Sequence, residues 1–235
     1  SYFQNNVGTT LNLLRFGQQV KEVVFSSSAA VYKPAGDGHS SMSEESPTEP
    51  TTPYGMSKLM SEEILKAHST AHADFKYTAL RYFNPVGAHP TGVIGEQPRK
   101  PNNLMPILAQ IALGGELSYL PVYGKDYDTP DGTCVRDYIH VCDVVEGHMK
   151  AWSYIKSGRN LVCNLGSGVG YSVLEMIAAY EGASEQEIDY AFEPRRAGDI
   201  GRLVADISTA KSVLNFQCKY TLADMCNSDW EWQIR

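Results

Sequence analysis

Segments with helical and strand patterns alternate along the whole chain, and this alternation is the feature that most constrains the fold. Apolar residues recur at helical spacing from Val7 to Phe16, and residues 23–25 then form a short apolar run typical of a buried strand. Further strand patterns follow at 77–82, 117–123, 138–141, 161–165 and 188–192. Alternation of this kind predicts an α/β protein with a mainly parallel sheet.

Capping residues mark where several helices should begin. Thr52 followed by Pro53 predicts an N-cap and a proline at the first position of a helix that runs to about His72. Two further helices are expected at 104–113 and 143–156. Another should begin at Ser172, which forms a capping box with Glu175, and the last two should follow the caps Asp206 and Thr221. Residues 34–52 and 84–101 are predicted to be loops, and loops of this length usually carry function.

Composition excludes several classes of protein. The 235 residues are 43% hydrophobic and 20% charged, which indicates a compact chain with a substantial core. The net charge of −7 argues against nonspecific binding to nucleic acid or to an anionic membrane, so a phosphate site must be a local basic cluster. The five cysteines form no CxxC pair and have no histidine at metal spacing, which favours a reduced, cytoplasmic chain without a metal.

One glycine-rich segment could be taken for a dinucleotide-binding turn. Residues 166–170 read Gly-Ser-Gly-Val-Gly between a strand and a helix pattern, but a GxGxxG motif that began at Gly166 would end where the chain has Tyr171. No such motif stands in the first 100 residues. We therefore interpret 166–170 as a tight turn near another ligand, not as a cofactor loop.

A tyrosine and a lysine give the clearest indication of chemistry. Tyr54 and Lys58 are four apart on a predicted helix and share a face, and a nearby ammonium favours the phenolate form that can act as a base. The spacing alone is common by chance. Ser28, however, ends the preceding strand at the rim where parallel sheets bind ligands, and its hydroxyl could bridge a substrate hydroxyl and the phenol.

Taken together, the motifs resemble the extended short-chain dehydrogenase/reductase family, and within it the UDP-galactose 4-epimerases. The resemblance covers essentially the whole chain. The motifs that carry it lie, in family order, at 26–32, 53–58, 80–90, 101–106, 131–141, 164–166 and 195–199.

The resemblance implies a Rossmann-type parallel sheet with a smaller α/β substrate-binding domain. Residues 1–83 would be the remaining part of the NAD-binding domain, and 84–235 mainly the UDP-sugar domain, with some segments returning to the Rossmann sheet. In the family the glycine-rich fingerprint lies upstream of the segment that matches residues 6–10. We therefore expect the chain to be the carboxyl-terminal two-thirds of an epimerase, which alone would bind NAD poorly and expose apolar sheet surface. Members of the family are often homodimers.

The implied reaction interconverts UDP-galactose and UDP-glucose with NAD through a 4-keto sugar. By resemblance, Tyr54 removes the proton of the sugar 4-hydroxyl, Ser28 bridges that hydroxyl and the phenol, and Lys58 binds the nicotinamide ribose and favours the phenolate. Tyr82 and Phe83 would pack beside the nicotinamide.

The resemblance also implies where the nucleotide sugar binds. Arginine suits a diphosphate because its planar fork donates paired hydrogen bonds. The implied contacts are Asn84, Asn103, Leu104, Arg136, Arg196 and Asp199, with Tyr123 and Val173 near the uracil and Leu203 beside the sugar.

Several of these residues also have a structural interpretation. Arg136 could form a surface ion pair with Asp131 or Asp137, and the arginines at 195–196 could lie in a solvated loop. The remaining alternatives are that Tyr123 and Val173 are core, that Glu44 and Glu45 are solvated, and that His89 and His140 are structural.

The chain departs from the family pattern at a few positions. Ala30 stands where threonine is usual and Lys33 where glycine is usual. Leu203 replaces the tyrosine or cysteine whose size is thought to decide whether an N-acetylated sugar fits, so that specificity stays open. Two other functions also stay open: a nucleotide-sugar 4,6-dehydratase, disfavoured because Ala29-Ala30 replaces the acidic pair of that group, and a noncatalytic UDP-sugar-binding protein.

Overall fold

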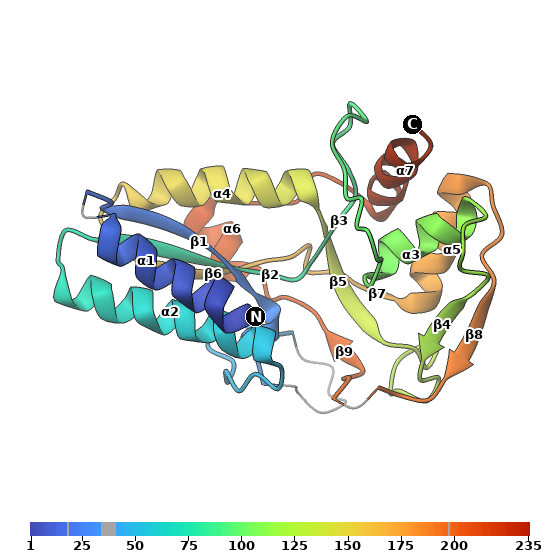
Figure 1. Ribbon diagram of the computed structural model, residues 1–235, viewed down its shortest axis with the longest axis horizontal. Coiled ribbons are helices and arrows are strands. Elements are labelled where there is room, and N and C mark those ends of the chain that lie inside the picture. Colours follow the sequence, from blue (N-terminus) through green and yellow to red (C-terminus); the bar gives the residue numbers. More distant parts are fainter. Residues whose placement is uncertain (18, 34–40, 197) are drawn as a thin grey trace.

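Two groups of secondary structure lie side by side in the computed structural model, which describes residues 1–17, 19–33, 41–196 and 198–235 (Figure 1). The first group is built on a parallel sheet in the order β1-β2-β6, with strands β1 (Glu22–Ser28), β2 (Lys76–Tyr82) and β6 (Leu161–Leu165). One face is covered by η1 (Phe3–Val7), α1 (Gly8–Phe16) and α2 (Pro53–Ala71), and the other by α4 (Val141–Ile155) and α6 (Ser208–Leu214) (Figure 1).

Alternate residues of β2 enter cores on opposite faces of this sheet. Tyr77 and Ala79 pack with Leu65 of α2, whereas Leu80 packs with Ala151 of α4. Both faces are covered, so five consecutive residues of β2, 77–81, are buried. The buried residues include two polar ones, Thr78 and the arginine Arg81.

The second group combines short strands with three helices. Strand β5 (Val135–His140) pairs parallel with β3 (Asn84–Val86) and β9 (Arg202–Leu203) and antiparallel with β7 (Gly170–Ser172). A separate parallel pair is formed by β4 (Leu120–Tyr123) and β8 (Tyr190–Glu193). Helices α3 (Leu104–Ala112), α5 (Val173–Ser184) and α7 (Leu222–Gln233) enclose the largest apolar cluster, with buried members such as Leu108, Ile177 and Met225.

The predicted α/β architecture with a mainly parallel sheet is confirmed, and so are three helix caps. The hydroxyl of Thr52 accepts a hydrogen bond from the N–H of Gly55 (3.1 Å) at the start of α2. Capping boxes open α5 and α7, as the sequence predicts: Ser172 with Glu175, and Thr221 with Asp224.

Other boundaries were wrong. Residues 84–101 contain the short strand β3, and β5 begins at Val135 because its backbone pairs there with β7 and β9. Strand β4 begins at Leu120, where the N–H first bonds to Asp189, instead of at 117, and β8 begins at Tyr190 instead of at 188. The N-cap of α6 is Ile207, although the carboxylate of Asp206 accepts from the N–H of Ser208 (2.8 Å). Part of the predicted 34–52 loop, 34–40, lies outside the described residues.

Apolar side chains are exposed on several helices. Leu11 and Phe16 of α1, Met60 of α2, and Met149 and Trp152 of α4 all face solvent. All five cysteines are free thiols. Within the described ranges, the helices are too short or too polar to cross a lipid bilayer.

Candidate active site

A cavity of about 340 Å³ opens where β1 and β2 end. The carboxyl ends of parallel strands meet at one edge of a sheet, which is where α/β proteins bind ligands. The cavity brings together six of the predicted site residues: Ser28, Tyr54, Phe83, Asn84, Asn103 and Leu104. The rest of its lining includes Pro85, Glu96 and Tyr138.

The first turn of α2 places Tyr54 against the end of β1. A Cβ added to Gly55 would lie 2.1 Å from the carbonyl oxygen of Ala30, so only glycine allows α2 to approach the 3-10 turn η2 (Ala29–Val31) this closely. Ser28 caps that turn by accepting from the N–H of Ala30 (3.2 Å). The serine hydroxyl and the phenol therefore line one cavity from two elements in direct contact.

Lys58 lies one turn behind the phenol. Its ammonium is 5.8 Å from the centroid of the Tyr54 ring and donates to the carbonyl oxygen of Ser26 (2.8 Å). Burial lowers the pKa of Lys58, because a charged ammonium loses solvation there. The predicted shared helix face of Tyr54 and Lys58 is confirmed.

The two residues expected beside the nicotinamide have different surroundings. Phe83 is buried with Ala29 and Val31 and still lines the cavity. The hydroxyl of Tyr82 instead donates to Oγ of Ser26 (2.8 Å) and contacts the ring of His148, and burial raises the pKa of Tyr82 to about 12. The sequence analysis missed His148, because nothing in the sequence of α4 indicates that this side chain reaches the ends of β1 and β2.

A second set of predicted residues lies on β5 and β9. Arg136 donates to the carbonyl oxygens of Val135 (3.0 Å) and Ile200 (2.9 Å), and its Nη2 is 3.9 Å from the carboxylate of Asp199. The alternative ion pair of Arg136 with Asp131 or Asp137 is therefore wrong. Leu203 pairs with Arg136 in the β5–β9 register, so these residues form one group.

An arginine stacks on the ring of Tyr123 at the end of β4. The guanidinium carbon of Arg196 lies 3.6 Å from the ring centroid, within the range of a cation–π interaction. The neighbouring Arg195 pairs with Asp126 (2.7 Å) and stacks on Tyr127. Both arginines are exposed in the loop after β8, as the alternative of a solvated loop predicts. Val173, expected near the uracil, packs against the apolar cluster of α3, α5 and α7. This packing agrees with the structural alternative, and the uracil contact of Val173 stays a prediction.

Strand β5 connects the cavity to the arginine group. The amide of Asn84 donates to the carbonyl oxygen of Asp137 (2.7 Å), which lies between Arg136 and the cavity residue Tyr138. Also in the cavity lining, the amide of Asn103 donates to the carboxylate of Glu96 (3.4 Å). A ligand that reaches from Tyr54 to Arg136 would therefore follow β5.

The glycine turn after β6 is occupied by a carboxylate of the protein itself. The buried side chain of Asp137 accepts from the N–H groups of Ser167 (2.7 Å), Gly168 (2.9 Å) and Ala205 (3.1 Å), and burial raises its pKa. These N–H groups are not available to a phosphate. Residues 166–170 are therefore a structural turn, as the imperfect GxGxxG spacing indicates, and Asp137 is a structural residue that the sequence analysis missed.

Two further polar residues stabilise the framework. The structural interpretation of His140 is confirmed: it caps α4 by accepting from the N–H of Cys142 (3.0 Å) and stacks on Tyr220. The prediction that Glu44 is solvated is wrong, since its carboxylate accepts from the N–H of Asn164 (2.8 Å) and from Thr209 (2.9 Å). Both residues position backbone next to the strands that carry the site.

Comparison with known proteins decides the family. Residues 1–166 match the family model described as "NAD dependent epimerase/dehydratase family". The chain belongs to this family. It is 49% identical to a UDP-glucose 4-epimerase of Yersinia enterocolitica and 48% identical to one of Bacillus subtilis, over 99% of the chain and 69% of each relative.

Solved structures of the family show the same fold. The UDP-glucose-4-epimerase of Stenotrophomonas maltophila, with bound NAD and formylated UDP-arabinopyranose, superimposes with a TM-score of 0.94 at 42% identity, over 99% of the chain and 69% of that protein. The UDP-glucose 4-epimerase of Bifidobacterium longum in complex with NAD+ and UDP gives a TM-score of 0.91 at 48% identity, over 99% of the chain and 70% of that protein. The resemblance and the Rossmann-type fold are confirmed, and the chain spans about 69% of the length of the relatives that it matches.

Proposed function

We propose that this protein interconverts UDP-galactose and UDP-glucose with NAD through a 4-keto sugar, and is thus an isomerase of galactose metabolism. One observation carries the proposal: Ser28 and Tyr54 line the same cavity, with the ammonium of Lys58 one turn behind the phenol. The identity of 49% to a UDP-glucose 4-epimerase supports the choice of reaction within the family.

In this proposal the side chains of the site transfer one proton and stabilise the charge of the group that takes it. Tyr54 takes the proton of the sugar 4-hydroxyl, and Ser28 donates a hydrogen bond to the same oxygen. Lys58, already within 5.8 Å of the ring, stabilises the phenolate by its charge. Bound NAD would supply the acceptor for the hydride of C4, which returns to the opposite face of the 4-keto sugar. Asn103 and Leu104, which line the same cavity, contact the nucleotide sugar.

The residues present fit the nicotinamide-ribose end of NAD. Phe83 and Pro85 give the cavity apolar surface suited to a flat ring, and Lys58 offers an ammonium that can donate to ribose hydroxyls. The N–H groups of the glycine turn at 166–170 are bonded to Asp137 and are not part of the proposed pyrophosphate site.

The nucleotide sugar is proposed to extend from the cavity along β5. The forks of Arg136 and Arg196 lie where they can donate paired hydrogen bonds to a diphosphate. The further proposed contacts are Asn84, Tyr123, Val173, Asp199 and Leu203.

The organisation around this site is also proposed. Residues 1–83 form the NAD side and 84–235 mainly the UDP-sugar side, supported by the pairing of β6 with β2, which returns a late segment to the first sheet. Exposed Leu11 and Met60 on the adjoining helices α1 and α2 suit a homodimer, which light scattering can measure. Five free thiols support a reducing compartment such as the cytoplasm.

Turnover of UDP-galactose with added NAD tests the proposal. Because the chain spans 69% of its relatives, we would assay it alone and as a chimera that adds the part of the Bacillus subtilis enzyme that it does not match. We expect UDP-glucose from the chimera, and loss of at least 100-fold in kcat for Tyr54→Phe, in line with removal of a general base. The matched control is Tyr190→Phe, an exposed tyrosine of β8. UDP-galactose binding without turnover in either preparation would instead indicate a noncatalytic binding protein.

A further inference from the structure

A row of polar side chains crosses the first sheet just before its strands end. Ser27 pairs with Arg81 in the β1–β2 register, and Arg81 pairs with Asn164 in the β2–β6 register. Residues paired in register point to the same face of a sheet. All three are at most 5% exposed, although each belongs to a residue type usually found at the surface. Their burial therefore requires partners.

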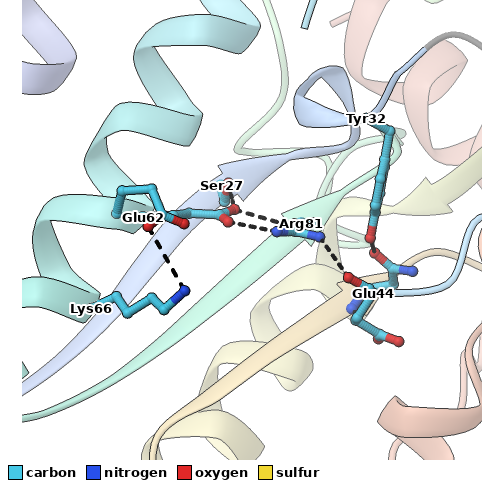
Figure 2. Close-up of polar contacts among 8 residues, drawn as sticks. Ser27, Tyr32, Glu44, Glu62, Lys66 and Arg81 are labelled. Atoms are coloured by element: carbon cyan, nitrogen blue, oxygen red, sulfur yellow. Dashed lines mark hydrogen bonds and ion pairs between the residues drawn. The ribbon is translucent and has the colours of Figure 1, made fainter. Parts of the chain in front are cut away.

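Glu62 of α2 is the first partner. Its two carboxylate oxygens accept from Nε (3.0 Å) and Nη2 (2.7 Å) of Arg81, and the hydroxyl of Ser27 donates to the same carboxylate (Figure 2). Glu62 lies about two helical turns after Tyr54. This paired contact, together with the bond from Lys58 to the carbonyl of Ser26, fixes α2 on the sheet along the helix that carries the phenol.

The other side of the guanidinium holds the segment that follows Ser28. The Arg81 guanidinium carbon lies 4.9 Å from the ring centroid of Tyr32, and its Nη1 donates to the carbonyl oxygen of Glu44 (3.2 Å). The hydroxyl of Tyr32 in turn donates to the side chain of Asn164 (2.6 Å). Figure 2 shows Glu62 and Tyr32 on opposite sides of Arg81. Tyr32 directly ends the turn η2 that Ser28 caps.

We propose that Arg81 is a positioning residue that sets the separation between the Ser28 hydroxyl and the Tyr54 phenol. It fixes α2 through Glu62 and η2 through Tyr32, the same two elements that meet where Gly55 approaches Ala30. The planar fork of arginine makes two parallel bonds to one carboxylate, which a lysine cannot reproduce. The inference rests on the proposed function and adds the residue that aligns its proton-transferring groups.

The kinetic test separates alignment from stability. Proton transfer requires heavy atoms within hydrogen-bond distance, and a displacement near 1 Å costs about 100-fold in rate. We expect Arg81→Lys and Glu62→Gln each to lower kcat about 100-fold and to change the KM for UDP-galactose less than about twofold, because the proposed UDP contacts lie on β5 and β4. Glu63→Gln, the next residue of α2, is the matched control. Ile155→Ala, a buried α4 residue, controls for lost stability alone.

An NMR measurement on the same chain reports alignment without turnover. The N–H of Ala30 bonds to Ser28, so its chemical shift and exchange rate follow the geometry of the turn. We expect Arg81→Lys to shift this resonance and raise its exchange about tenfold (roughly the loss of one hydrogen bond), whereas Ile155→Ala leaves both unchanged. If no version of the chain turns over UDP-galactose, the proposed function fails and the Ala30 amide alone decides the positioning role. An Ala30 amide that behaves identically in wild type and Arg81→Lys would overturn that role, whatever the kinetics.

Discussion

Buried carboxylates on the two sides of the molecule are compensated in different ways. Glu62, under the first sheet, receives the paired N–H groups of Arg81. Asp229, between α5 and α7, receives the neutral phenol of Tyr180 (2.7 Å). Burial consequently raises the pKa of Asp229 to about 6, because a neutral donor does not replace the solvation that a charged carboxylate loses.

The two carboxylates also differ in how close they lie to the proposed catalytic residues. The ion pair lies beneath the segments that carry Ser28 and Tyr54, where geometry must be maintained near neutral pH. Asp229 lies beside the apolar cluster of α3, α5 and α7, where packing supplies most of the stability and a change of protonation displaces no proposed catalytic group. The sheet side therefore adds a charged, directional contact to its apolar cores, whereas the helical side buries a carboxylate with a neutral donor only.

Removal of one partner of the ion pair should have the largest effect on stability. Glu62→Ala leaves the Arg81 guanidinium buried and unpaired, so we expect the free energy of unfolding to fall by about 3–5 kcal/mol in urea denaturation. Glu63→Ala removes an exposed pair with Lys66 on the same helix and should cost less than about 1 kcal/mol. Equal losses for the two variants would contradict the distinction between buried and exposed pairs.

Acid should stabilise the helical side through Asp229. A carboxyl whose pKa is raised on folding binds its proton more tightly in the native state, so its contribution is complete below pH 3.8 and is lost as the pH rises through about 6. The measurement is the difference in unfolding free energy between wild type and Asp229→Asn. We expect the wild type to gain up to about 3 kcal/mol relative to the variant between pH 7 and pH 4.

Asp206 supplies the matched control of opposite sign. Hydrogen bonds from Ser208 lower the pKa of its carboxyl, so its contribution is present above pH 3.8 and is lost as the pH falls below that value. The difference between wild type and Asp206→Asn should therefore shrink on acidification. A pH-independent difference for Asp229→Asn would show that this carboxyl is not perturbed by burial.

A smaller effect is expected at the proposed nucleotide end, and on binding instead of stability. Arg196 stacks on Tyr123 at the surface, so Arg196→Ala should leave the urea midpoint almost unchanged. Loss of a charged donor to a diphosphate should raise the Kd for UDP roughly 10- to 100-fold in calorimetry. Arg159→Ala, which removes a similar stack on Tyr154 of α4, should leave the Kd for UDP unchanged. An unaltered Kd for Arg196→Ala would exclude it from the UDP site.

Local signals in the sequence predicted the framework well. Thr52, Ser172 and Thr221 act on N–H groups within three residues, so their roles can be recognised without the fold. The Tyr54–Lys58 pair was predictable for the same reason, since helix geometry alone places the two on one face. Ser28 joined them because a parallel sheet brings strand ends to a single edge.

Contacts between distant segments could not be predicted in this way. Glu62 meets Arg81 and Ser27 across separations of 19 and 35 residues, and the pairing depends on the register of β1 and β2. The predicted ion-pair partner of Arg136 was wrong for a similar reason. Sequence proximity suggested Asp131 or Asp137, whereas the β5–β9 pairing brings Asp199 to the guanidinium and the tight turn after β6 occupies Asp137.

The smallest predicted effect concerns the threonine N-caps of two helices, α2 on the sheet side and α7 on the helical side. Thr52→Ala and Thr221→Ala each remove a hydroxyl that accepts from the first turn of a helix, and each should lower the free energy of unfolding by about 1 kcal/mol. Only α2 carries Tyr54, so only Thr52→Ala should lower kcat with UDP-galactose, whereas Thr221→Ala should turn over at the wild-type rate. Equal stability losses with equal kcat would show that the first turn of α2 is fixed by the contact of Gly55 with Ala30 and by Glu62, and not by its cap.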